Sequence, residues 1–411
     1  MQSSTEKLSN FFLGVGAKRL TPVEVDPNSS NQHEFNGVNA LKEIFGESND
    51  KLRINARFVH FGEDASQSVC NGEVTWYDAR RSNPKRSAEY RLYWRKNEVM
   101  ERAKPRDLMF FARLSTGEFL ILISESDSIF TDQLAWLFDL QLDEGNSIVM
   151  ASQRHREQSL DFCSRLILEA IGIDSYQSNT LDELTERCLQ TFNYDFPSTA
   201  EFSEFARNSL GDVEPLENPD AALMAWVSRE HALFSAFEKR VIGPRVERGF
   251  MTEGVPDIDS FIKFSLSVQN RRKARAGASL EHHVAAIFKA NGLMFEREKV
   301  TEGKKKPDFL FPDQASYHDP DFDDQDLRML GVKSSLKDRW RQVLNEADRI
   351  NQKHLLTLEP SISEAQLTEM LQSHIRLVLP KEIHKTFTQR GRDNLLTLED
   401  FIEDVAHLQR Q

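Results

Sequence analysis

The chain has 411 residues and a mass of 47.3 kDa, which is too long for one ordinary domain and predicts two or three. Hydrophobic residues make up 39% of it and charged residues 28%, which excludes a disordered polyelectrolyte and a collagen. The mean hydropathy is −0.53, and no apolar run approaches the ~20 residues that span a bilayer, so we expect no membrane protein.

The N-terminal sequence has no basic stretch followed by an apolar core, which predicts that the chain carries no secretion signal. The three cysteines are odd in number and lie far apart, at Cys70, Cys163 and Cys188. A zinc knuckle or a disulfide framework needs short paired spacings, so we expect neither. A cytoplasmic location is the simplest expectation.

Acidic residues outnumber basic residues by 65 to 52, which taken alone argues against a nucleic-acid partner. Net charge sets only the distant field, however, and binding depends on where positive charges gather. Ten Lys or Arg face four Asp or Glu between Trp76 and Arg106, and ten face five between Asn270 and Leu310. Each half therefore contains a basic segment that is either a solvated face or a phosphate-binding surface.

Residues 1–150 are rich in β-branched and aromatic runs separated by polar or glycine-containing turns, a pattern typical of an all-β barrel. Ser115–Gly117 predicts a tight hairpin turn between two of these runs. One short helix is expected at Val38–Gly46. The expected strands are Leu52–Phe61, Glu73–Arg81, Glu89–Trp94, Asp107–Leu114 and Glu118–Ser124.

Residues 151–190 have a helical pattern and are predicted to form a connector, and residues 191–411 are predicted to form a second domain. That domain begins with apolar residues at helical spacing and becomes mixed after Gly277. From there we expect a helix, three strands, a helix, a strand, a helix and a strand. The second domain is therefore predicted to have an α/β fold.

The residues best suited to chemistry are Asp308, which opens the apolar strand after Pro307, and Lys333, which ends a later strand. A carboxylate and a lysine at the ends of neighbouring strands are suited to phosphodiester hydrolysis. The carboxylate would hold Mg²⁺, and the ammonium would stabilise negative charge or assist the attacking water. An isolated Pro-Asp followed by a lysine also occurs by chance, so this pair alone is weak support.

A hard divalent ion needs more than one carboxylate, and Gly331 stands two residues before the lysine, where an acid is often found. Glu346 is the candidate replacement, because it lies at the margin of the apolar stripe of a helix expected after Lys333. Glu281 flanks the apolar face of the preceding helix and is a third candidate. Either glutamate could instead be an ordinary solvated helix residue.

Three stretches then resemble the catalytic domain of the EcoRII restriction endonuclease family, which belongs to the PD-(D/E)XK nucleases. They are SVQNRRKARAGASLEHH, VTEGKKKPDFLFP and MLGVKSSLKDRWRQVLNEADRI, and the likeness runs from about Phe192 to the C-terminus. It includes an acid that has migrated to a position thirteen residues after the lysine, met here by Glu346. The resemblance implies that Asp308 and Glu346 bind metal and that Asp308, Lys333 and Glu346 are catalytic, with Glu281 in support.

The resemblance also implies which residues read DNA in this domain. Related nucleases that cut at runs of C and G use a basic-acidic-basic group at the start of this helix, matched here by Lys337, Asp338 and Arg339 with Arg341. Arginine pairs with G and a carboxylate accepts from the C amino group, although a charged first helical turn is common in itself. Tyr317 is a weaker candidate, and His282 and His283 are expected to be ordinary helix residues. The predicted phosphate contacts are Arg271, Arg272, Lys273 and Arg275.

The N-terminal half contains AKRLTPVEVDPNSSNQHEF, then ARFVHFGEDASQSVCNGEVTWYDAR, then SAEYRLYW. These stretches resemble, more loosely, the effector domain of the same family, a DNA-binding pseudobarrel related to the plant B-three domain. The resemblance implies that two arms clasp duplex DNA, here residues 18–33 and 80–91. Glu89 would be a possible base reader, and a solvated hairpin is the competing interpretation. The expected DNA contacts are Lys18, Arg19, His33, Arg81, Lys85, Arg86, Glu89 and Arg91.

Taken together, the sequence predicts a Mg²⁺-dependent type II restriction endonuclease of a bacterial or archaeal cytoplasm. The resemblance implies a homodimer, a target rich in CC and GG, and an effector domain that restrains cleavage until it binds a second copy of the target. A DNA-binding regulator with an inactive nuclease fold, or a repair nuclease that reads mismatched or modified cytosine, remain alternatives. The full target sequence and the effect of methylation stay open.

Overall fold

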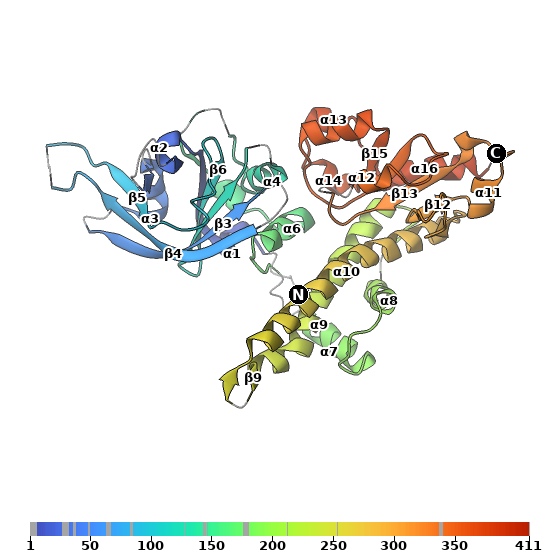
Figure 1. Cartoon of the computed structure of the whole chain (residues 1–411), viewed down its shortest axis with the longest axis horizontal. Coiled ribbons are helices and arrows are strands. Elements are labelled where there is room, and N and C mark those ends of the chain that lie inside the picture. The colour runs from blue at the N-terminus through green and yellow to red at the C-terminus, as the bar shows by residue number, and fades with distance from the viewer. Residues whose placement is uncertain are drawn as a thin grey trace. The chain divides into compact units, whose positions relative to one another are not determined.

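The protein is represented by a computed structural model of the whole chain (Figure 1). It divides into two compact units: the N-terminal unit, Met1–Ser175 with Ser361–Ser363, and the C-terminal unit, Tyr176–Pro360 with Glu364–Gln411. The residues that the structure describes are 6–26, 33–35, 38–47, 50–62, 67–82, 85–126, 128–142, 145, 147–175, 181–211, 213–252, 254–336 and 340–410.

The described strands of the N-terminal unit form one eight-stranded sheet in the order β2-β5-β4-β3-β7-β6-β1-β8. Neighbouring strands are antiparallel, except that β3 and β7 are parallel. The strands are β1 (Phe12–Arg19), β2 (Glu34–Phe35), β3 (Leu52–Phe61), β4 (Gln67–Asp78), β5 (Tyr90–Trp94), β6 (Leu108–Leu114), β7 (Phe119–Ser124) and β8 (Val149–Met150).

The five strands expected from the sequence are present, and the hairpin between β6 and β7 is confirmed. Its turn closes where the Gly117 amide donates to the Leu114 carbonyl at 2.9 Å, with Gly117 at a φ of 91°. Strand β1 was not predicted, because Gly14 and Gly16 interrupt its apolar pattern. A Cβ at Gly16 would lie 2.6 Å from the Met150 sulfur, so the glycine lets β8 pair closely with β1.

The predicted barrel is reproduced only as a sheet. Among the described residues the end strands β2 and β8 are not hydrogen-bonded to each other, so the sheet has two edges. Apolar clusters lie on both of its faces, one containing Phe110 and Leu122 and the other containing Trp76 and Phe111. A B-three-like pseudobarrel therefore remains a proposal.

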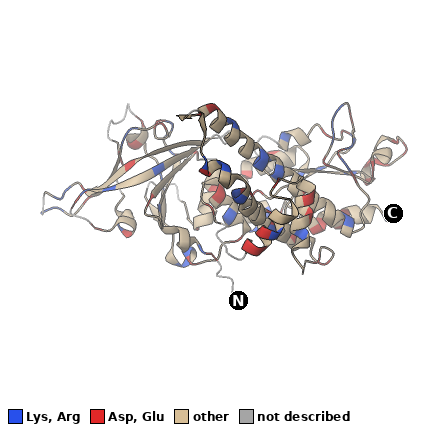
Figure 2. Cartoon of the chain, turned by 90° about the horizontal axis from the view of Figure 1, so that it is seen from below, with Lys and Arg blue, Asp and Glu red and all other residues tan. Residues whose placement is uncertain are grey.

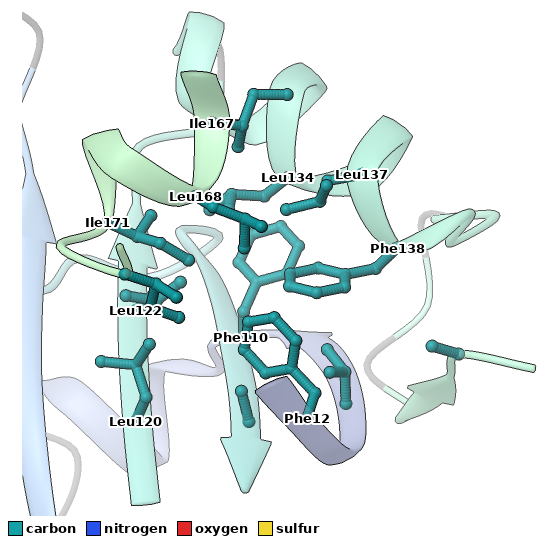
Figure 3. Packing of buried hydrophobic residues seen from close by; sticks show 14 of the residues in the cluster. Phe12, Phe110, Leu120, Leu122, Leu134, Leu137, Phe138, Ile167, Leu168 and Ile171 are labelled. Carbon is teal, nitrogen blue, oxygen red and sulfur yellow. The ribbon is translucent and has the colours of Figure 1, made fainter. Parts of the chain in front are cut away.

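Helices cover this sheet, and Figure 3 shows how two of them pack over one face. Leu134 and Leu137 of α4 and Leu168 of α6 close over Phe110 of β6 and Leu122 of β7. The helical segments of this unit are α1 (Leu8–Phe11), α2 (Pro22–Val25), η1 (Asn39–Leu41), α3 (Lys42–Phe45), α4 (Ile129–Phe138), α5 (Gln153–Arg156) and α6 (Phe162–Ala170).

The expected connector at 151–190 is not a separate element, which corrects the predicted domain boundaries. Helix α6 buries Ile167 and Leu168 in the N-terminal unit. Helix α7 (Asp182–Thr191) instead buries Cys188 and Leu189 in the C-terminal unit, together with Phe202. Each helix has one apolar face, and each face belongs to a different hydrophobic core, so the division falls between Ser175 and Tyr176.

The C-terminal unit begins with a helical layer in which α10 packs along α9 and α8. A Glu230 carboxylate oxygen on α9 lies 2.8 Å from Nε2 of His283 on α10, and both side chains are buried. Helix α10 continues through Gly277, where a change of structure was predicted, because the helical backbone there has open space on its outer side. These helices are α8 (Thr199–Asn208), α9 (Pro219–Glu247) and α10 (Ile258–Ala290), with a hairpin of β9 (Met251–Thr252) and β10 (Val255–Pro256) between the last two.

A five-stranded sheet in the order β11-β12-β13-β14-β15 follows among the described residues, and it confirms the predicted mixed α/β fold. Strands β11, β12 and β13 are antiparallel, and β13, β14 and β15 are parallel. The strands are β11 (Glu296–Arg297), β12 (Phe309–Phe311), β13 (Arg328–Val332), β14 (Lys353–Leu356) and β15 (Ile375–Val378). The accompanying helices are α11 (Gln314–His318), η3 (Asp324–Asp326), α12 (Trp340–Val343), α13 (Glu364–Gln372), α14 (Lys381–His384), α15 (Gln389–Arg392) and α16 (Leu398–Leu408). No described helix combines the length and apolar character needed to cross a membrane.

The placement of α7 makes a prediction about the C-terminal unit expressed alone. A fragment of residues 181–411 keeps Cys188 and Leu189 in the core, whereas a fragment of residues 192–411 loses both. We expect the shorter fragment to be less stable by roughly 2–5 kcal/mol, the usual result of emptying a buried apolar site. Urea denaturation of the two fragments measures the difference, and equal midpoints would contradict this packing of α7.

Candidate active site

Asp308 and Lys333 lie at the same edge of the C-terminal sheet. Asp308 directly precedes β12, and Lys333 directly follows β13. In the antiparallel pairing Phe309 faces Leu330, so the start of β12 lies beside the end of β13. Two side chains that are 25 residues apart in sequence are thereby brought into contact.

The Asp308 carboxylate is held by two donors. Its Oδ2 accepts from Nζ of Lys333 at 2.9 Å and from the Val332 amide at 2.6 Å. The side chains of Asp308 and Lys333 are 16% and 18% exposed, so the pair lies at the surface end of the sheet and is largely shielded. This geometry fixes one carboxylate oxygen and the ammonium together.

Glu346 is not on a helix, which corrects the predicted helix of residues 337–352. Helix α12 ends at Val343, and Glu346 lies in the turn that follows, where its amide donates to the Val343 carbonyl at 3.1 Å. The next residue, Ala347, has a φ of 51°, which no continuing right-handed helix allows. The apolar residues Ala347 and Ile350 are buried as predicted, but by a turn rather than by a helical stripe.

The carboxylate of Glu346 is close to both members of the Asp308–Lys333 pair. Burial raises the pKa of Glu346 to about 7; Lys333 opposes this rise and Asp308 adds to it. The Oε2 atom of Glu346 is buried and has no hydrogen-bond partner within the described part of the chain. Lys333 and Asp308 thus act electrostatically on Glu346 at this edge, and the joint role of the three residues stays a prediction.

A steric contact explains why position 331 is a glycine. A Cβ built on Gly331 would lie 2.9 Å from Cγ2 of Val343 on α12. Helix α12 thus packs directly on the backbone of β13, and an acidic side chain at position 331 would displace it. The turn that follows Val343 brings Glu346 to the site instead.

Glu281 lies near this site but is held by a different partner. Its Oε2 accepts from Nη2 of Arg297 at 2.8 Å, and Nη1 of Arg297 lies 3.3 Å from Nδ1 of His282. Burial raises the pKa of Glu281, Asp308 adds to the rise, and Arg297 opposes it. Arg297 was not predicted from the sequence, because an arginine in a short strand is usually solvated. His282 and His283 are engaged by Arg297 and Glu230, as expected of ordinary helix residues.

The residues at this edge fit a divalent cation held mainly by non-protein ligands. Among the described residues, no group of three or more His, Cys, Asp or Glu side chains is arranged to hold a metal. Asp308 and Glu346 are nevertheless two like-charged carboxylates in a shielded site, and the buried Oε2 of Glu346 lacks a donor. Mg²⁺ commonly uses one or two carboxylates and completes its shell with water and phosphate oxygens, which matches this donor set.

The predicted base-reading group lies mostly outside the described residues, since Lys337, Asp338 and Arg339 are not among them. Arg341 is described: it is half exposed, and its Nη2 donates to Glu369 at 2.8 Å. Its guanidinium also lies over the Trp340 ring, 4.8 Å from the centroid. Arg341 is therefore accessible to a ligand at the outer side of α12.

The basic residues of α10 are turned partly inward. The Arg271 guanidinium lies 3.8 Å from the centroid of the Phe196 ring, and Nε of Arg272 donates to the buried Glu238 at 2.6 Å. Arg272 keeps 54% of its side chain exposed, whereas Arg275 is buried against Phe202. Burial corrects the prediction that Arg275 contacts phosphate. Arg271, Arg272 and the exposed Lys273 remain candidates.

Tyr317 is not exposed to a ligand, which corrects its place among the DNA-contacting candidates. Its side chain is only 1% exposed. The hydroxyl group donates to Glu302 and accepts from the Arg349 amide at 3.1 Å. Tyr317 is therefore part of the protein interior beside the site.

The candidate contacts of the N-terminal unit differ in accessibility. Lys18 is 3% exposed and its Nζ lies 2.5 Å from the buried Glu24, so burial corrects its assignment to DNA. Arg91 bridges Glu34 and Glu89, each at 2.8 Å, and Glu89 also pairs with Arg80. The remaining candidates, which are exposed or half-buried, are Arg19, His33, Arg81, Lys85 and Arg86. Figure 2 shows Lys and Arg spread over both the sheet-rich and the helix-rich parts, with Asp and Glu among them.

The chain is similar to known proteins over the stretch that contains this site. A family model described as EcoRII C terminal matches residues 234–402. The type II restriction enzyme EcoRII of Escherichia coli is 42% identical over 214 residues, which are 52% of this chain and 51% of that protein. The type II restriction enzyme SsoII of Shigella sonnei is 23% identical over 160 residues, 36% of this chain and 50% of that protein. A solved structure of metal-depleted Ecl18kI in complex with uncleaved DNA is 20% identical, has a TM-score of 0.44, and covers 56% of this chain and 84% of that one.

The chain is thus a relative of type II restriction enzymes. More narrowly, its residues 234–402 match the family model described as EcoRII C terminal, and Asp308, Lys333 and Glu346 all lie within that stretch. The chain spans about half the length of the curated relatives that it matches.

The contact between Gly331 and Val343 predicts the effect of adding a single methyl group. Gly331→Ala should destabilise the C-terminal unit by roughly 1–3 kcal/mol, because Val343 is β-branched and cannot rotate away freely. Gly277→Ala is the matched control, since its Cβ meets nothing within 4 Å. It should be neutral or stabilising by up to about 1 kcal/mol. Urea denaturation compares the two variants, and a neutral Gly331→Ala would refute the close packing of α12.

The raised pKa of Glu346 predicts that replacing this glutamate with glutamine stabilises the protein at high pH but not at low pH. The folded chain favours the protonated carboxyl, so its stability falls as the pH rises from about 4.5 to about 7 and stays lower above that. Glu346→Gln removes this cost without changing shape and should stabilise the metal-free protein at pH 8 by roughly 1–3 kcal/mol. At pH 4.5 the gain should vanish. Denaturation at both pH values in a chelating buffer measures it, and an equal gain at both would be contrary to this assignment.

Proposed function

We propose that this protein is a type II restriction endonuclease that cleaves double-stranded DNA at a specific site in the presence of Mg²⁺. The observation that carries the proposal is the meeting of Asp308, Lys333 and Glu346 at one edge of the C-terminal sheet. The similarity to EcoRII and SsoII, and the family model that matches residues 234–402, support it.

In the proposed reaction a water molecule attacks the scissile phosphate, and the products carry 5′-phosphate and 3′-hydroxyl ends. Asp308 and Glu346 are the residues that would hold Mg²⁺, which when bound polarises the phosphate and makes the water more acidic. Lys333 lies 2.9 Å from Asp308 and places its positive charge beside the reacting phosphate, where negative charge develops. Glu281, held by Arg297, adds a further carboxylate at the border of the site.

The proposed target contains CC and GG, read by residues at the start of α12. An arginine in this region recognises guanine by two hydrogen bonds, and an aspartate accepts from the cytosine amino group. Arg341 is the described member of the group; it is half exposed and pairs with Glu369 at 2.8 Å, so contact with a base would require it to exchange partners. Sequence-specific binding in the same unit as the carboxylates would align the scissile phosphate with Lys333.

The N-terminal unit is proposed to bind a second copy of the target and thereby to regulate cleavage. Its support is a group of basic side chains around the end of the β4–β5 hairpin, with exposed Arg81, Lys85 and Arg86. The network of Glu34, Glu89 and Arg91 fixes the polar groups on the neighbouring strand. Such a rigid, charged strand face suits contact with a phosphate backbone.

A homodimer is proposed because cleavage of both DNA strands at one site requires two catalytic centres, and each chain supplies one. The described part of the C-terminal unit exposes an apolar stripe at the start of α10, made by Ile258, Phe261, Ile262 and Leu266. These side chains are 47–65% exposed and recur at helical spacing. A second copy of the chain would cover such a stripe.

The proposed chemistry predicts a separation of binding from cleavage. Asp308→Asn keeps an acceptor for the Val332 amide, and Lys333→Ala removes the ammonium; each should lower the cleavage rate in Mg²⁺ by roughly 100-fold or more. Specific DNA binding should stay within a few-fold of the wild type. Asp404→Asn is the matched control, because Asp404 pairs with Arg328 at the far end of β13 at 2.7 Å.

Digestion of a DNA of known sequence, followed by sequencing of the ends, measures this and identifies the target. Wild-type cleavage by either site variant would contradict the assignment of the site. A wild-type protein that binds DNA but never nicks it in Mg²⁺ would favour the regulator with an inactive nuclease fold. Preferential cutting of mismatched or modified duplexes would favour the repair nuclease.

A further inference from the structure

The turn that carries Glu346 is not held by helical hydrogen bonds. Helix α12 ends three residues earlier, and Ala347 has a φ of 51°, a sparsely populated conformation for a residue with a side chain. Backbone of this kind keeps one geometry only when its surroundings impose it. The position of the Glu346 carboxylate therefore depends on what contacts residues 346–349.

The loop of residues 301–306 makes those contacts. Oγ1 of Thr301 accepts from the Ala347 amide at 3.4 Å, and Oε2 of Glu302 accepts from the Asp348 amide at 3.2 Å. Nζ of Lys305 lies 3.4 Å from Oδ2 of Asp348. The loop runs through Pro307 directly into Asp308, so one short segment is bonded covalently to the first carboxylate and non-covalently to the turn of the second.

Tyr317 bonds to both this loop and the turn that carries Glu346. Its buried hydroxyl donates to Oε1 of Glu302 and accepts from the Arg349 amide at 3.1 Å. Burial and the bond to Glu302 raise the pKa of Tyr317, so the phenol keeps its proton. Arg349 in turn donates to the carbonyls of Asp319 at 2.9 Å and Phe322 at 2.8 Å, which ties the end of α11 to the same turn.

We infer that Tyr317 and Glu302 are positioning residues that hold the turn carrying Glu346, so that Glu346 and Asp308 can bind one divalent cation together. Glu302 accepts simultaneously from the Tyr317 hydroxyl and from the Asp348 amide, so the hydroxyl orients the carboxylate that supports the turn. In this role neither residue is itself a ligand of the cation. The inference rests on the proposed function only in taking Asp308 and Glu346 as the metal ligands.

A purely structural role for these bonds makes a different prediction. If they only stabilised the fold, their loss would lower the melting temperature and leave the affinity for metal unchanged. A positioning role changes the affinity for metal in a protein that remains folded. The test therefore measures metal binding and the local opening of the turn, independently of cleavage.

The test uses the full-length protein and the variants Tyr317→Phe, Glu302→Gln and the double variant. Tyr194→Phe is the matched control, because Tyr194 also donates to a glutamate, Glu186, at 3.0 Å, on α7 and outside the site. Binding of Mn²⁺ is measured by electron paramagnetic resonance of the free ion. Hydrogen exchange of the amides of residues 346–350 is measured by mass spectrometry without metal.

We expect each single variant to weaken Mn²⁺ binding at least fivefold and to speed exchange of these amides at least tenfold. The control should change neither quantity by more than twofold. Because one hydrogen bond joins the two side chains, their effects should be less than additive, so the double variant should bind Mn²⁺ more tightly than the product of the two single effects predicts. Mn²⁺ affinities within twofold of the wild type in both single variants would overturn the inference.

Failure of the proposed function has a separate signature. If the wild-type protein binds no Mn²⁺, the assignment of Asp308 and Glu346 as ligands is wrong. Hydrogen exchange then decides whether Tyr317 and Glu302 hold the turn: unchanged exchange in both variants overturns that role, and faster exchange supports it.

Discussion

The burial of the Glu346 carboxylate, near a second carboxylate and a lysine, is the main constraint on the candidate site of this protein. Asp308 is fixed by the Val332 amide and Lys333, and the Glu346 carboxylate lies near it with a buried oxygen that accepts no hydrogen bond in the described chain. A carboxylate in that position costs folding free energy when it is charged, and burial raises its pKa to about 7. Such a cost is typical of a functional site, where binding of a cation offsets it.

Contacts of the backbone around the site hold Glu346 in this position. Val343 packs on the backbone of β13 at Gly331, which brings α12 close to the sheet and lets the chain turn back with Glu346. Residues 301–306 and Tyr317 then hold the turn. Gly331, helix α12 and the loop of residues 301–306 thus act together. They place an acid that comes from the segment after the strand, and not from the strand itself.

The sequence predicted those features that depend on local pattern. Apolar runs located β12, β13, β14 and β15, and the types of residue at their ends pointed to Asp308 and Lys333. The spacing to Glu346 was also found, but its turn was taken for a helix, because Trp340, Val343, Ala347 and Ile350 recur at helical spacing. They are buried, yet Ala347 has a left-handed backbone that only the tertiary contacts of Thr301 and Glu302 explain. Tyr317 and Lys18 were assigned to the surface for a related reason, since their burial depends on distant partners that no local pattern reveals.

Helix α10 is long and continuous, so it connects two distant features of the C-terminal unit. At 1.5 Å per residue, about 35 Å separate the exposed Ile258 from Glu281 along a single unbroken axis. Gly277 lies within that span without breaking the helix. Glu230 and Arg207 both contact His283 on the same helix. The exposed apolar stripe at the start of α10 and the Glu281 carboxylate therefore lie on one continuous helix.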